Sequence, residues 1–143
     1  MGGARPNSSE TVHLTIPSRL EELAQVHALL EELGQRHGMD EDYVNSLLIA
    51  VIEAGTNAVQ HGNMFADDKV VKFEVTVDPG NVHVRVDDLG HGFDPSRVLN
   101  PTEGEQLLSP HGRGLFLMRQ LMDEVKFETG PEHGTTVFLR KAR

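Results

Sequence analysis

The sequence predicts a two-layer α/β sandwich in which helices cover one face of a mixed, mostly antiparallel sheet. Three observations carry this prediction: short segments with apolar residues at every second position, longer segments with apolar residues at helical spacing, and a compact Asp-Pro-Gly-Asn turn between two alternating segments. The chain has 143 residues, of which 38% are hydrophobic, which suits one globular domain. We expect a disordered N-terminal arm at residues 1–10 and a single domain at residues 11–143.

The first strand is expected at residues 11–16, where apolar and polar residues alternate, and Pro17 ends it. Ser18 and Glu21 have the spacing of a capping box, so they predict the start of a helix. Apolar residues then recur at helical spacing as far as Gly38, which is expected to break the helix.

The second helix is expected to begin after Asp40, a good N-cap residue, and to stop at Gly62 in the left-handed conformation. Its apolar residues recur at helical spacing, but Glu53, Asn57 and His61 are each four residues apart. These three side chains therefore form one polar stripe on an otherwise apolar helix. A carboxylate and a carboxamide on such a helix make sense if the stripe faces a ligand.

The strongest hairpin signal follows, because residues 71–77 and 82–86 both alternate and residues 78–81 form a turn between them. Residues 93–110 have no sustained periodicity, and we expect them to form a lid over a functional site or to be disordered. One further helix and two strands are expected at residues 115–122, 125–127 and 137–139. The sheet face away from the helices is expected to be exposed or to be used for dimerisation.

Composition excludes several classes of function. Thirteen Lys and Arg against 22 Asp and Glu give a net charge of −9, which is a poor match to a nucleic-acid backbone but is compatible with a basic protein partner. No segment is long and apolar enough to span a membrane, and the start lacks a signal-peptide pattern. There are no cysteines, and the eight histidines are scattered, so we expect a cytoplasmic protein without a zinc site.

Two glycine-rich segments point to a bound nucleotide. In the first, Asp88, Gly90 and Gly92 form an Asp-x-Gly-x-Gly pattern directly after a predicted strand, and the glycines allow the backbone to approach a ring closely. The pattern alone is weak, because Asp and Gly are common in turns. Its position after a strand and before a long loop makes it informative.

The second segment has Gly112, Arg113 and Gly114 at the start of a helical pattern. Backbone N–H groups at a helix start can face phosphate oxygens, and Arg113 is either a phosphate contact or an ordinary surface arginine. No Gly-Lys-Ser/Thr sequence is present, which excludes a P-loop nucleotide site. Near the end of the chain, Thr135 and Thr136 begin the last predicted strand.

Four elements occur in a fixed order: Glu53-x3-Asn57, Asp88-x-Gly-x-Gly, Gly112-x-Gly and Gly134-Thr. In this order they resemble the Bergerat-type ATP-binding fold of the GHKL superfamily, which includes gyrase, heat-shock chaperones, histidine kinases and mismatch-repair ATPases. Within it, the short chain looks most like the bacterial anti-sigma factor serine/threonine kinases. The resemblance covers roughly residues 14–141.

The resemblance implies roles for the site residues. Glu53 would be the general base, Asn57 would hold Mg²⁺ with the ATP phosphates, and His61 would line the phosphate side or orient its neighbours. Asp88 would accept a hydrogen bond from the adenine amino group. The hydroxyl of either Thr135 or Thr136 would point towards the adenine.

The resemblance also implies partners. The protein would sequester a sigma factor and phosphorylate a Ser or Thr of an anti-sigma antagonist protein, and it would form a homodimer through its N-terminal strand and sheet edge. Two alternatives stay open: a regulatory module that binds ATP without catalysis and inhibits its partner by contact, and a simple ATPase in which water replaces the acceptor hydroxyl.

Overall fold

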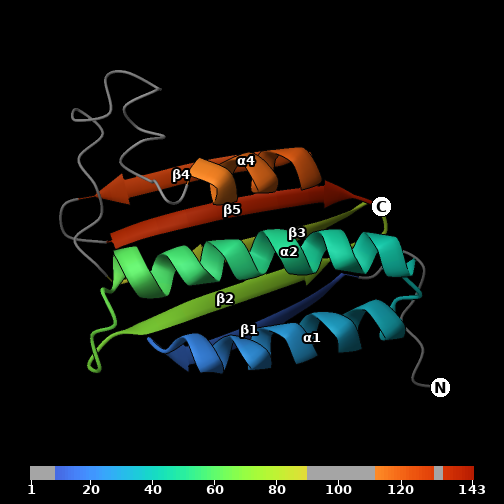
Figure 1. The fold of residues 1–143 in the computed structure, drawn as a ribbon. Coiled ribbons are helices and arrows are strands. Elements are labelled where there is room, and N and C mark those ends of the chain that lie inside the picture. The colour runs from blue at the N-terminus through green and yellow to red at the C-terminus, as the bar shows by residue number, and fades with distance from the viewer. Residues whose placement is uncertain (1–8, 90–111, 131–133) are drawn as a thin grey trace.

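The computed structural model describes residues 9–89, 112–130 and 134–143, and these form one sheet with helices against it (Figure 1). The expected lid, Gly90 and Gly92 therefore lie outside the described residues, as do residues 1–8 of the expected N-terminal arm. The sheet has five strands in the order β1-β2-β3-β5-β4. Their bounds are β1 Glu10–Pro17, β2 Val70–Val77, β3 Asn81–Asp87, β4 Glu124–Gly130 and β5 Gly134–Ala142.

All four described strand pairings are antiparallel, whereas the sequence predicted a mixed, mostly antiparallel sheet. The hairpin prediction is confirmed: β2 and β3 pair from Lys72 opposite Asp87 to Val77 opposite Val82. The N–H groups of Gly80 and Asn81 both donate to Asp78 Oδ1, at 2.8 and 2.6 Å, which fixes the turn. Strand β5 lies between β3 and β4, and it is antiparallel to β3. The start of β5 is therefore next to the end of β3, where Thr136 is opposite Asp87.

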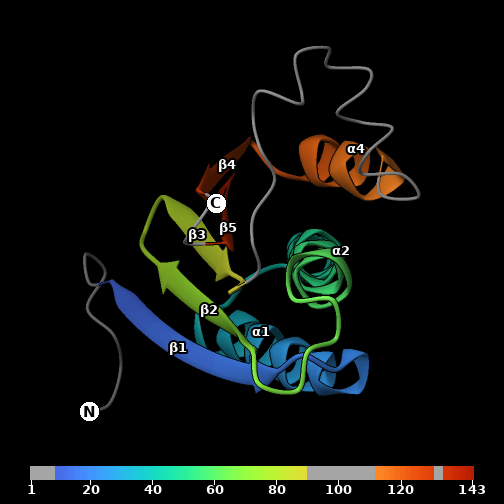
Figure 2. The ribbon, with the colours of Figure 1, turned by 90° about the vertical axis from the view of Figure 1, so that its left-hand side faces the viewer.

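Three α-helices lie on the same face of this sheet (Figure 2). They are α1 Leu23–Arg36, α2 Glu41–Asn57 and α4 Gly112–Leu121, and α2 lies between the other two. Two short segments extend them: a 3₁₀ turn, η1 Leu20–Glu22, precedes α1, and a π-helical turn, η2 Ala58–Gly62, continues α2. The predicted two-layer α/β sandwich is confirmed. No helix in the described part of the chain is long and apolar enough to cross a membrane.

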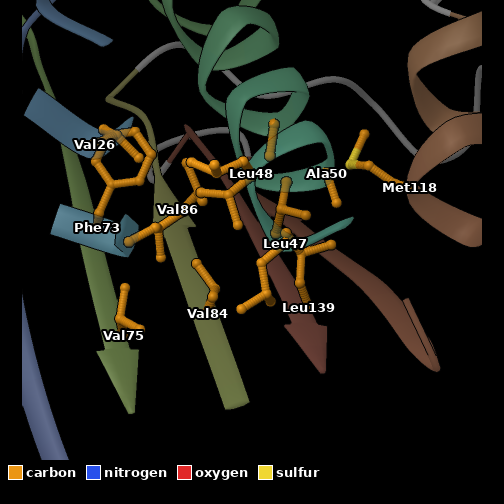
Figure 3. Packing of buried hydrophobic residues seen from close by; sticks show 14 of the residues in the cluster. Val26, Leu47, Leu48, Ala50, Phe73, Val75, Val84, Val86, Met118 and Leu139 are labelled. Carbon is orange, nitrogen blue, oxygen red and sulfur yellow. The ribbon is translucent and has the colours of Figure 1, made fainter. Parts of the chain in front are cut away.

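One apolar core fills the space between the two layers (Figure 3). Val75, Val84 and Val86 point from the strands towards Leu47 and Leu48 of α2, which explains why alternation in the strands and helical spacing in α2 were both visible in the sequence. Burial of these side chains is the main stabilising contribution, at roughly 25 cal/mol per Å² of apolar surface removed from water.

The prediction that Ser18 and Glu21 cap the first helix is wrong. The N-cap of the 3₁₀ turn is Arg19, and Ser18 is buried and donates a hydrogen bond to the carbonyl of Lys69 at 2.7 Å. A long-range partner has therefore taken the hydroxyl that a local cap would have used. Asp40 does occupy the N-cap position of α2 with an extended backbone, but its side chain makes no capping hydrogen bond.

The two predicted helix-ending glycines behave differently. Gly38 has φ +64°, so it ends the first helix in the left-handed region as expected. Gly62 is not among the glycines with positive φ, so the prediction of a left-handed stop there is wrong. Instead the helix widens into η2, where the Asn63 N–H donates to the carbonyl of Ala58 at 2.8 Å, five residues earlier.

Candidate active site

Glu53 and Asn57 lie one turn apart near the end of α2, and both are partly buried. The helix can lie close to the sheet at this point because Gly55 has no side chain. A Cβ there would be 2.7 Å from Leu23 Cδ2 and 3.1 Å from Phe73 Cζ. Gly55 therefore allows the close packing of α2 at the point where Glu53 and Asn57 are attached to the helix.

Asn57 carries an unsatisfied polar atom. Its Oδ1 is buried and has no hydrogen-bond partner among the described residues. Leaving a buried acceptor unpaired costs about 1–3 kcal/mol, so such an atom needs an explanation, and a ligand is one. A neutral carbonyl oxygen suits a hard divalent cation such as Mg²⁺, so the chemistry of Asn57 fits the metal role that the resemblance implies for it.

His61 does not continue the predicted stripe. The π-helical turn spaces its hydrogen bonds by five residues rather than four, so the ring no longer lies directly one turn beyond Asn57. The residue is exposed, although partial burial of the ring lowers the pKa of His61 from its ordinary value of 6.5. An imidazole with a lowered pKa is mostly neutral at neutral pH.

Asp88 is the buried carboxylate of this region, with only 5% of its surface exposed. Its N–H donates to the carbonyl of Thr135 at 3.0 Å, and its Oδ1 accepts the N–H of Thr135 at 3.1 Å. Two glycines make room for it. A Cβ on Gly62 would be 2.1 Å from Asp88 Oδ2, and a Cβ on Gly134 would be 2.4 Å from the Asp88 carbonyl oxygen.

Asp88 is thus the point where three segments meet: the end of η2, the end of β3 and the start of β5. The contact with Gly62 also gives that glycine its physical reason. It is required by the close approach of a carboxylate and not by a left-handed backbone. Gly134 needs both, since its φ is +71°.

The two threonines of β5 lie on opposite faces of the sheet. Thr135 shares the helix-side face with the buried Val137, because side chains alternate along a strand. Thr136 lies on the face away from the helices, where its hydroxyl donates a short hydrogen bond to Asp87. Of the two, Thr135 is therefore the one on the Asp88 side of the sheet.

The remaining predicted residues are described only in part. Gly112, Arg113 and Gly114 form the first turn of α4, whose ten residues run beside α2. Their side-chain surroundings, like Gly90 and Gly92, lie outside the described residues. The structure thus places Glu53 and Asn57 in the last turns of α2, and Asp88 beside Gly62 at the end of the π-helical turn that continues this helix.

Sequence reasoning assigned no role to Asn63, which is 1% exposed and lies directly after η2. Its side chain joins Ser18 and Val70 on one side to Leu89 on the other. The sequence offers no periodic signal for this residue, because these partners are up to 45 positions away. The only cue is a polar residue just beyond a helix end.

Comparisons with known proteins agree with this architecture. The family described as "Histidine kinase-like ATPase domain" matches residues 16–141. The serine-protein kinase RsbW of Bacillus subtilis is 31% identical over 141 residues, which cover 94% of this chain and 87% of that protein. RsbW of Bacillus velezensis is 34% identical over 140 residues and covers 94% of this chain and 86% of that protein.

Two solved structures share the fold. One, of the RsbU and RsbW domains of a Mycobacterium tuberculosis protein, has a TM-score of 0.66 at 24% identity and covers 94% of this chain and 33% of that one. The other, the SiaB–SiaC complex of Pseudomonas aeruginosa, has a TM-score of 0.65 at 11% identity, with coverages of 92% and 89%. The chain belongs to the histidine kinase-like ATPase domain family and, within it, to the family of the RsbW serine-protein kinases.

Proposed function

We propose that this member of the RsbW family is an ATP- and Mg²⁺-dependent serine/threonine protein kinase of the anti-sigma-factor type. It binds a sigma factor and phosphorylates a Ser or Thr of an anti-sigma antagonist protein. The names of the relatives as serine-protein kinases support the reaction class, and the acidic net charge of −9 suits a basic protein partner. We place this activity in the cytoplasm.

The observation that carries the proposal is the pair formed by Glu53 and Asn57. A buried carboxamide oxygen that has no partner in the described part of the chain lies one helical turn from a partly buried carboxylate. Asn57 would hold Mg²⁺ through Oδ1, and the ion supplies charge neutralisation for the triphosphate. A purely structural asparagine would be expected to have its oxygen paired within the protein.

In the proposed transfer, the Glu53 carboxylate accepts the proton of the acceptor hydroxyl. The hydroxyl oxygen forms a bond to the γ-phosphorus of ATP, and the bond from that phosphorus to the β–γ bridging oxygen breaks. The electron pair leaves with ADP, so the products are ADP and a phosphoserine or phosphothreonine. The role of the protein is to position the hydroxyl and to hold the proton at Glu53.

Two further segments would bind the nucleotide. Asp88 accepts a hydrogen bond from the adenine amino group, and the hydroxyl of Thr135 points towards the adenine from the same face of the sheet. Guanine is disfavoured because it presents a carbonyl in place of that amino group. The backbone N–H groups at the start of α4, from Gly112 to Gly114, would face the phosphates and add the favourable field of a helix N-terminus.

The first test is calorimetric titration of the protein with ATP and GTP, in Mg²⁺ and in EDTA. The proposal expects binding that is selective for ATP and depends on Mg²⁺. If the folded protein binds no nucleotide, the proposed kinase activity is refuted. The alternative is then a module that inhibits its partner by contact. Hydrolysis of ATP at a rate that no protein acceptor changes would favour the simple ATPase.

The second test addresses Glu53. Glu53→Gln should keep ATP binding within about twofold but lower phosphoryl transfer by about 100-fold, the usual scale of general base catalysis. Glu41→Gln is the matched control, because Glu41 is an exposed carboxylate in the first turn of the same helix. Equal transfer by both variants would show that Glu53 is not the base.

We also propose a homodimer. In the described sheet, β1 and β4 are the edge strands, and an unpaired edge is a template for pairing with a second chain. Light scattering during size-exclusion chromatography measures the mass directly. A mass near twice 15.8 kDa supports the dimer, and a mass near 15.8 kDa at high protein concentration contradicts it.

A further inference from the structure

Asn63 makes an unusually complete set of hydrogen bonds for a side chain outside any helix or strand. Its Oδ1 accepts the N–H of Leu89 at 2.8 Å. Its Nδ2 donates to Ser18 Oγ at 2.8 Å and to the carbonyl of Val70 at 2.9 Å. With 1% exposure, water cannot replace these partners.

Only a carboxamide satisfies this environment. The N–H of Leu89 can only donate and the carbonyl of Val70 can only accept, so the orientation of the amide is fixed by its neighbours. The hydroxyl proton of Ser18 is already donated to the carbonyl of Lys69, at 2.7 Å, which leaves Ser18 Oγ as an acceptor. A carboxylate would supply no donor, and an apolar side chain would leave several buried groups unpaired.

The two ends of this network have different roles. Ser18 directly follows β1 and Val70 begins β2, so the amino end of the side chain is attached to the frame of the sheet. Its oxygen holds the N–H of Leu89, which belongs to the same peptide unit as the Asp88 carbonyl. That carbonyl and the Asp88 carboxylate occupy the space that a side chain at Gly134 would need.

Hydrogen bonds therefore hold Asp88 itself and also the peptide unit that follows it. Thr135 pairs with its N–H and with Oδ1, and Asn63 fixes the peptide unit that follows. If the second attachment is lost, that peptide unit can rotate, and among the hydrogen bonds of the described residues those to Thr135 are then left to set the direction of the carboxylate. A hydrogen bond to a base is sensitive to such a rotation, because it weakens steeply with angle.

We propose that Asn63 is a positioning residue that sets the base selectivity of the nucleotide site through Asp88. The inference rests on the proposed role of Asp88 in reading adenine and extends it to a residue that touches no nucleotide. Its consequence is specific: loss of the Asn63 oxygen lowers discrimination between ATP and GTP and not only stability.

The test compares Asn63→Ala with Ser18→Ala by calorimetric titration with ATP and GTP, after the unaltered protein has been measured. Both variants remove a buried hydrogen bond to the sheet frame, but only Asn63→Ala removes the acceptor for Leu89. We expect Asn63→Ala to lower the ATP-over-GTP affinity ratio about tenfold, the effect of one misdirected hydrogen bond. Ser18→Ala should keep that ratio within about twofold, although its melting temperature falls.

An unchanged ratio in folded Asn63→Ala would overturn the role of Asn63 alone, since the unaltered protein would still select ATP. If the unaltered protein does not prefer ATP, the proposed reading of adenine fails first and this inference fails with it. Should Asn63→Ala not fold, hydrogen exchange of the Leu89 amide in the unaltered protein decides instead. Slow exchange, about 100-fold protected or more, is expected for an N–H held by a buried side chain, and unprotected exchange would refute the attachment.

Discussion

Replacing Gly134 with alanine tests whether Asp88 lies as close to β5 as the structure places it. A Cβ on Gly134 would be 2.4 Å from the Asp88 carbonyl oxygen and 2.7 Å from Oδ1, whereas ordinary contact begins at 3.4 Å. The atoms must therefore separate by about 1 Å (3.4 − 2.4). The carbonyl cannot easily move, because Asn63 holds the N–H of the same peptide unit.

Gly38→Ala is the matched control. Gly38 has φ +64° against +71° for Gly134, but a Cβ on Gly38 would meet nothing within 4 Å. Both variants pay the cost of a left-handed alanine, about 1–2 kcal/mol. Only Gly134→Ala adds the cost of overlap in a packed site, about 1–3 kcal/mol.

We therefore expect urea denaturation to show a loss of about 2–5 kcal/mol for Gly134→Ala and about 1–2 kcal/mol for Gly38→Ala. ATP affinity should fall at least about tenfold in Gly134→Ala, because Asp88 and the N–H of Thr135 are displaced together, and stay unchanged in Gly38→Ala. Equal losses of stability in the two variants would refute the close approach.

Asn57→Ala should raise the stability of the ligand-free protein by about 1 kcal/mol in urea denaturation, since it removes a buried acceptor that no described residue pairs with, while Mg²⁺-dependent ATP binding is lost; a destabilised variant would contradict this. His61→Gln should flatten the stability profile on the acid side of pH 6.5. Because the folded-state pKa of His61 is lowered from 6.5, its contribution is present above pH 6.5 and is lost as the pH falls through the lowered value. Met64→Gly should stabilise the protein by about 0.5–1 kcal/mol in the same assay, because Met64 is 73% exposed and has φ 52°; Met64→Ala, which keeps a Cβ, should show no gain.

The helices and strands could be predicted because apolar residues recur in each of them at the spacing of a helix or a strand. Val71, Phe73 and Val75 alternate in the sequence because one face of β2 meets the helices, and the turn at Asp78 follows from its side chain accepting two nearby N–H groups. The sequence pattern Glu-x3-Asn likewise placed Glu53 and Asn57 on one face of a regular helix.

The predictions failed where a residue serves a distant partner. Ser18 looked like a helix cap but bonds to Lys69, 51 positions away, and Gly62 looked like a helix stop but makes room for Asp88. The same limit hid Asn63, whose partner Leu89 is 26 positions away. In each case the local pattern offered one reason for the residue, and the packed structure supplied a different one.

Asp88 and Asn57 differ in a way that indicates what each end of the site requires from a ligand. The Asp88 carboxylate is buried but already accepts a backbone N–H, so it is fixed in direction before any ligand arrives. A preorganised acceptor favours selectivity, because a ligand with the wrong edge must leave it unsatisfied. Asn57 Oδ1 is buried without a described partner, so its free-energy cost is relieved only when a donor or cation comes from outside. On the proposed function, the base end of the site therefore contributes mainly specificity, and the phosphate end gains the most free energy when ATP and Mg²⁺ bind together.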